Sequence, residues 1–117
     1  MKKIQTTIAI HETFLELAQF NPHKTLAEII DEASLQLLVK LQKNDNKSCE
    51  LYRSMVWQKQ AGKSNEGYTR QCVRLPRQVW EYCEMGSIKK SVYINKALQY
   101  YFGYGQQQHL QGEHTSL

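Results

Sequence analysis

The sequence of 117 residues contains few cysteines, and their spacing excludes the usual cysteine frameworks. Its three cysteines are Cys49, Cys72 and Cys83, and no two of them form a C-x-x-C pair. We therefore expect reduced thiols and neither a disulfide framework nor a zinc site. The four histidines also match no metal-ligand spacing. We expect the protein to bind no cofactor.

Long apolar runs are absent as well. A membrane-spanning helix needs about 20 consecutive apolar residues, and no segment approaches this length. Residues 1–12 begin with two lysines but continue with alternating polar residues, which is not the pattern of a secretory signal. These features predict a soluble, cytoplasmic protein that does not associate with membranes.

Patterns typical of enzymes are also missing. No Ser/His/Asp, Cys/His or paired-carboxylate arrangement has a context that supports catalysis. Gly62-Lys63-Ser64 resembles the end of a phosphate-binding loop, but Trp57 stands where that motif requires its first glycine. A chain of this length accommodates one compact domain or two very small ones. We do not expect an enzyme.

Positive charge is concentrated in one segment. The formal net charge is +4, and residues 69–104 hold six Lys/Arg against two Asp/Glu, while the rest of the chain is balanced. A basic segment of this kind favours nucleic-acid binding, although it also occurs as an ordinary solvated face.

Hydrophobic spacing predicts a strand and two helices in residues 1–43. Residues 4–10 alternate, which places their isoleucines on one face of a strand. Helical spacing follows over about residues 12–20 and stops at Pro22. Thr25 and Glu28 then form a capping-box pattern at the start of a longer helix that extends to about residue 42.

The same order recurs after a connecting segment. Residues 44–67 predict an extra helix over 49–61, capped by Ser48, and then a flexible linker. Residues 68–104 predict a strand that ends at Pro76, a helix over 77–85, a turn and a helix over 91–102. The low apolar content of residues 105–117 predicts a flexible tail.

The recurrence indicates an internal repeat. Equivalent positions lie 65 residues apart in the strand and short helix, and 64 apart in the longer helix. One copy alone would expose a strand edge and an apolar helix stripe, whereas two copies pair their strands and share a core. We expect a mainly α fold with a short two-stranded antiparallel β-ribbon. Pairing within the chain and exchange with a second chain both remain open.

The residues TRQCVRLPRQVWEYCEM (69–85) and KKSVYINKALQYYF (89–102) resemble a ribbon-helix-helix domain of the Arc/MetJ superfamily. Four residues match the S-x-x-I-x-x-A-L pattern of its last helix, namely Ser91, Ile94, Ala97 and Leu98. The first copy is weaker, because His11 replaces the proline and Ser34 replaces the leucine. Two repeats in one chain are similar to the TraY family of conjugative-transfer proteins. The resemblance implies a tandem ribbon-helix-helix fold that forms an intramolecular pseudo-dimer.

The resemblance also implies that the ribbon enters the major groove of double-stranded DNA. Period-2 alternation turns Val73 and Leu75 toward the core and the neighbouring side chains outward. The candidate base-contacting residues are Lys3, Gln5, Thr7, Arg70, Cys72 and Arg74. The two strands carry different side chains, which predicts an asymmetric DNA site. For an isolated strand, the alternative is that these residues simply face solvent.

Phosphate contacts are expected at the starts of the two longer helices, where unpaired N–H groups and the helix dipole favour anions. The candidate residues are Lys24, Thr25, Lys89, Lys90 and Ser91. Thr25 and Ser91 could instead act as plain helix caps. The second start carries two lysines, so we expect the second copy to hold the DNA backbone more tightly.

The resulting hypothesis is a sequence-specific DNA-binding protein that acts as a transcriptional regulator or as a relaxosome accessory protein and could self-associate on DNA. One alternative is an antitoxin-type module that binds a protein partner through residues 49–61 or through the tail. A phage or plasmid structural adaptor that reuses the fold is another.

Overall fold

The computed structural model describes residues 3–61 and 67–103. Its elements are β1 (Lys3–His11), α1 (Glu12–Gln19), α2 (Leu26–Leu41), α3 (Asn46–Ala61), β2 (Tyr68–Pro76), α4 (Arg77–Gly86) and α5 (Lys90–Phe102). The described chain is mainly helical with one two-stranded antiparallel sheet, which confirms the coarse fold prediction. The predicted tail and much of the predicted linker lie outside the described residues.

The two strands pair along their full length. Lys3 lies opposite Pro76, Thr7 lies opposite Cys72, and His11 lies opposite Tyr68. Because side chains alternate between the two faces of a strand, every second residue of each strand points toward the helices. On this inner face Ile8 and Leu75 are fully buried.

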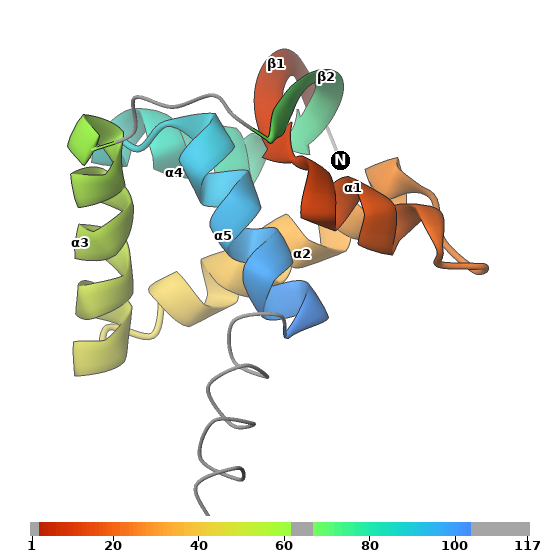
Figure 1. Cartoon of the computed structure of the whole chain (residues 1–117). Helices are drawn as coiled ribbons and strands as arrows, with labels where there is room; N and C mark the ends of the chain where they lie inside the picture. The colour runs from red at the N-terminus through yellow and green to blue at the C-terminus, as the bar shows by residue number, and fades with distance from the viewer. Residues whose placement is uncertain (1–2, 62–66, 104–117) are drawn as a thin grey trace, which may run out of the picture.

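The helices form a layer beneath the ribbon. In Figure 1, α2 and α5 cross each other under the two strands, with α1 on one side and α4 on the other, while α3 stands at the outer edge. α2 packs against α5 and β2, α5 also packs against β1, and α3 packs against both α2 and α5. The buried positions of α2 are Ile29, Ile30, Ala33, Ser34, Leu37, Leu38 and Leu41. Those of α5 are Tyr93, Ile94, Ala97 and Leu98. The core therefore joins residues from both halves of the sequence.

Local capping explains where α1 and α2 begin. Nδ1 of His11 accepts a hydrogen bond from the N–H of Thr13 at 3.1 Å and caps α1. At the start of α2, the Thr25 hydroxyl accepts from the N–H of Glu28, and the Glu28 carboxylate accepts from the N–H of Thr25. The predicted capping box is therefore confirmed.

The predicted cap at Ser48 is wrong, and the alternative that Ser91 caps its helix is not observed. α3 begins at Asn46, and the Asp45 carboxylate accepts from the N–H of Ser48 at 2.7 Å. Ser48 lies inside the helix, where its hydroxyl donates to the carbonyl of Lys40. Lys89 is the N-cap residue of α5, so Ser91 lies within that helix. In both cases the serine hydroxyl has a tertiary partner, which local spacing does not reveal.

None of the helices in the described residues is long and apolar enough to cross a membrane.

Tyr93 joins the two longer helices at the centre of the core. It is fully buried, and its hydroxyl donates a hydrogen bond to the carbonyl of Ser34 at 2.8 Å. Burial raises the pKa of the Tyr93 phenol far above its ordinary value, so the hydroxyl remains a donor. This hydrogen bond connects α5 to α2 inside the core.

We expect Tyr93→Phe to lower the free energy of unfolding by about 1 kcal/mol, because the Ser34 carbonyl loses a buried donor while the ring is retained. Tyr82→Phe is the matched control, since the Tyr82 hydroxyl has no hydrogen-bond partner among the backbone and side chains that the structure describes. Urea denaturation of both variants measures the difference. Equal midpoints for Tyr93→Phe and the unmodified protein would contradict this role.

Candidate nucleic-acid interface

The outward side of the ribbon brings together all six predicted base-contacting residues. We call this side the reading face, and it comprises Lys3, Gln5, Thr7, Arg70, Cys72 and Arg74, all of them exposed. Gln5 lies directly opposite Arg74, and Thr7 lies opposite Cys72. Arg70 lies opposite the small side chain of Ala9. The face is therefore continuous across both strands.

The six side chains differ in the partners they have. Within the described residues, no hydrogen bond or ion pair engages the guanidinium groups of Arg70 and Arg74. The Gln5 amide donates to Sγ of Cys72 at 3.0 Å, whereas the Lys3 ammonium forms an ion pair with Asp31 of α2. The two arginines are therefore exposed without a partner in the described part of the chain, and Lys3 is held toward α2.

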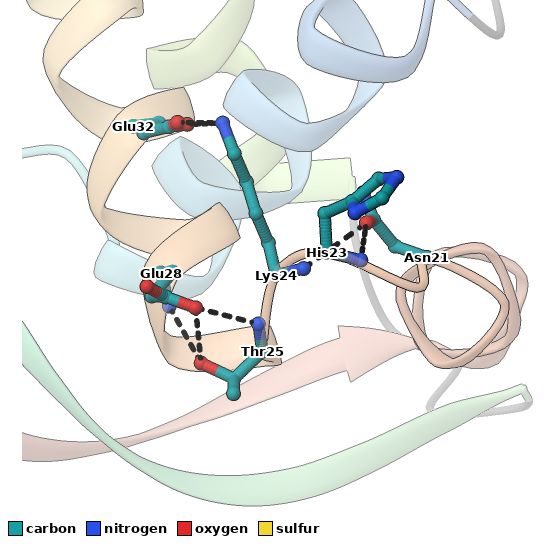
Figure 2. Close-up of polar contacts among 6 residues, drawn as sticks. All are labelled: Asn21, His23, Lys24, Thr25, Glu28 and Glu32. Atoms are coloured by element: carbon teal, nitrogen blue, oxygen red, sulfur yellow. Dashed lines mark hydrogen bonds and ion pairs between the residues drawn. The ribbon is translucent and has the colours of Figure 1, made fainter.

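The start of α2 is electrically balanced. As Figure 2 shows, Lys24 extends along the helix to Glu32, and Thr25 and Glu28 form the capping box beside it. The hydrogen bond to Glu32 raises the pKa of Lys24, and the N–H of Thr25 lowers the pKa of Glu28. Two acidic groups thus lie at a helix start that was predicted to bind a phosphate.

The start of α5 has a different electrostatic character. No acidic residue lies in its first turn, and its N-cap residue, Lys89, is exposed and makes no side-chain cap. Lys90 forms an ion pair with Glu84, and its ammonium lies 4.0 Å from the centre of the Trp80 ring. A hollow of about 440 Å³ lies between this start and Thr7 of β1. Lys89 is therefore the predicted phosphate-contacting lysine that has no ion-pair partner in the described part of the chain.

Ser91 and Asn95 of α5 contact the backbone of β1. The Ser91 hydroxyl accepts from the N–H of Ala9 at 2.9 Å. The Asn95 side chain accepts from the N–H of His11 at 2.9 Å and donates to the carbonyl of Ala9 at 2.7 Å. Sequence reasoning missed Asn95, although a polar residue between the buried Ile94 and Ala97 was a usable signal. The hydroxyl of Ser91, predicted to contact phosphate, thus accepts a hydrogen bond from the ribbon backbone.

Among the residues that the structure describes, no three His, Cys, Asp or Glu side chains group as metal ligands do. Cys49 and Cys72 are free and exposed, whereas Cys83 is free and buried. Burial raises the pKa of the Cys83 thiol to about 12.

Comparisons of the chain with family models, with curated proteins and with solved structures find no match.

The three thiols should react in a defined order with a maleimide at pH 8. Cys72 and Cys49 are exposed and should be labelled within minutes, while Cys83 is buried with a pKa of about 12 and should be labelled only after denaturation. Mass spectrometry of peptides from the labelled protein measures each site. Labelling of Cys83 in the native protein at the rate of Cys49 would contradict the packing of α4.

Proposed function

We propose that this protein is a sequence-specific double-stranded DNA-binding protein that inserts its ribbon into the major groove. The observation that carries the proposal is the strand register, because it assembles paired polar side chains on one exposed face. On that face, Arg70 and Arg74 are exposed and have no partner among the described residues.

The chemistry of the reading face suits base edges. A major groove about 12 Å wide admits a two-stranded ribbon, and an arginine can donate two hydrogen bonds to guanine O6 and N7. Glutamine can pair with adenine, and threonine offers a hydroxyl and a methyl group. Arg70, Arg74 and Gln5 are therefore our principal base-contacting residues, with Thr7 and Cys72 at the middle of the ribbon. Lys3 would contribute after leaving Asp31.

A pseudo-dimeric, tandem ribbon-helix-helix architecture is the second part of the proposal. The central strand pair, Thr7 and Cys72, consists of equivalent positions, 65 residues apart. Burial follows the same offset, since Phe14 and Ala18 of α1 correspond to Val79 and Cys83 of α4. The first residues of α2 and α5 are 64 apart. These coincidences support an approximate two-fold axis through the centre of the ribbon.

The DNA site is proposed to be asymmetric. Under the repeat offset Arg70 is equivalent to Gln5, and Arg74 is equivalent to Ala9. Equivalent positions would thus face the two half-sites with different chemistry. A perfect palindrome could not satisfy both halves equally.

Phosphate contacts are proposed mainly at the start of α5. Lys89 is exposed there without an ion-pair partner in the described chain, and the α5 start carries no acid in its first turn. At the α2 start, Glu28 and Glu32 oppose an anion and Lys24 is already paired. The second copy should hold the backbone more tightly for this reason.

The biological role that fits this activity is transcriptional regulation or the accessory binding of a plasmid transfer origin. The antitoxin-type alternative remains a separate hypothesis. Met55 of α3 is fully buried, and the Tyr52 hydroxyl donates to the carbonyl of Gly86 at 2.9 Å, so this side of α3 already contacts its own chain. A protein partner would have to bind elsewhere on α3 or at the tail.

Replacing Arg70 and Arg74 together with alanine should abolish site discrimination and leave the fold intact. Each bidentate contact is worth about 1–3 kcal/mol of base discrimination, so the double variant should lose about 2–6 kcal/mol of preference for its site. The site is first selected from a random duplex library at two salt concentrations, and binding is then compared with that to a scrambled duplex.

Arg53→Ala is the matched control, because it removes an exposed arginine of α3, which is distant in sequence from both strands. It should retain discrimination. Unchanged discrimination by the double variant would refute base reading by the ribbon, and failure of the unmodified protein to bind any duplex at low salt would refute DNA binding itself.

The two predicted phosphate sites should differ in their dependence on salt. Lys89→Ala should reduce the slope of log K against log salt by about 0.9, the value for one lost phosphate contact. Lys24→Ala should change it less, because Lys24 is neutralised by Glu32. Titrations at four salt concentrations measure both slopes, and a larger change for Lys24→Ala would reverse the assignment.

A further inference from the structure

The ribbon is fastened to the helices more firmly at one end than at the other. At the end where Ala9 lies opposite Arg70, three hydrogen bonds from α5 hold the β1 backbone. Ser91 and Asn95 supply these bonds from successive turns on one face of the helix. We call this pair of residues the α5 clamp.

Two further contacts close the same end. The rings of His11 and Tyr68 meet edge to face with their centres 5.0 Å apart. The N–H of Glu12 donates to the carbonyl of Gly67 at 2.8 Å. Both strands are therefore restrained beside Arg70.

The other end lacks the clamp. The α2 residues that precede Ser91 and Asn95 by 64 positions are Ala27 and Asp31. Alanine has no hydroxyl, and an ionised carboxylate cannot donate to a strand carbonyl. Pro76, the equivalent of His11, has no N–H to donate. Consistent with this mismatch, Oδ1 of Asp31 is buried without a hydrogen-bond partner in the described chain.

We propose that Ser91 and Asn95 are positioning residues that make base discrimination stricter at the Arg70 end of the reading face than at the Arg74 end. A bidentate contact with guanine requires a fixed direction of approach, and a strand that is already restrained loses less conformational freedom on binding. The inference deepens the proposed function and rests on it. Neither residue touches a base. They act through the Ala9–Arg70 strand pair.

The test measures discrimination separately at each end. Every base pair of the selected site is substituted in turn. The variants Arg70→Ala and Arg74→Ala then identify the base pair that each arginine faces. Binding of the full-length chain to this panel is then repeated with Asn95→Asp, Ser91→Ala and Ser91→Thr. Asn95→Asp retains the acceptor for His11 but removes the donor to Ala9, which reproduces the carboxylate of Asp31.

We expect the unmodified protein to discriminate at least about threefold more strongly at the Arg70 base pair than at the Arg74 base pair. Asn95→Asp and Ser91→Ala should each reduce discrimination at the Arg70 base pair by about three- to tenfold and leave the Arg74 base pair unchanged. Ser91→Thr keeps the hydroxyl and should restore the preference. Because discrimination is a ratio of two affinities for the same variant, a general loss of stability or of charge attraction cancels.

Amide hydrogen exchange tests the clamp without DNA. In the unbound protein, Ser91→Ala should speed exchange of the Ala9 amide by about fivefold or more, with the Arg74 amide unchanged. Unaltered exchange at Ala9 would overturn the clamp itself. Equal discrimination at the two ends, or equal loss at both ends in Asn95→Asp, would overturn the positioning role even if Arg70→Ala abolishes reading. If neither arginine variant alters discrimination, the proposed function fails, and this inference fails with it.

Discussion

The antiparallel pairing of β1 with β2 is the interaction on which the rest of the molecule depends. Neither strand has another partner in the described chain, and each would expose an unpaired edge without the other. The pairing joins segments about 65 residues apart, so the intervening helices must fold compactly between them. It also decides which side chains share the outward face, because a slip of one residue would turn Arg70 and Arg74 inward. Both the fold and the reading face therefore depend on the register of β1 against β2.

The two longer helices, α2 and α5, differ in the polar contacts that they make. The start of α2 is closed by the Thr25–Glu28 capping box, whereas α5 starts at a lysine with no side-chain cap. On α5, Asn95 donates a hydrogen bond to the β1 backbone, while Asp31 of α2 forms an ion pair with Lys3. Both helices pack apolar residues into one shared core, so the difference between them lies in their polar side chains. Asymmetry therefore appears where DNA contact is proposed.

Much of the fold could be predicted from the sequence, because its main signals are local. Alternation located both strands of the described chain, helical spacing located its five helices, and the Thr25–Glu28 spacing identified a true capping box. The wrong cap at Ser48 and the capping alternative for Ser91 fail for the same reason. Ser48 and Ser91 carry a typical capping side chain, yet the hydroxyl of each bonds to a segment outside its own helix. A capping rule considers only neighbouring residues, so it cannot detect such a competitor.

The sequence by itself determined which side chains of each strand lie together on its polar side, since successive side chains point to opposite sides of a strand. Only the tertiary structure decided which of their charges remain available. Lys3 is paired with Asp31 and Lys24 with Glu32, whereas the guanidinium groups of Arg70 and Arg74 have no partner in the described chain. The physical reason is that an ion pair requires two groups within about 4 Å. Residues 28 positions apart, such as Lys3 and Asp31, reach that distance only once α2 has packed beneath the ribbon.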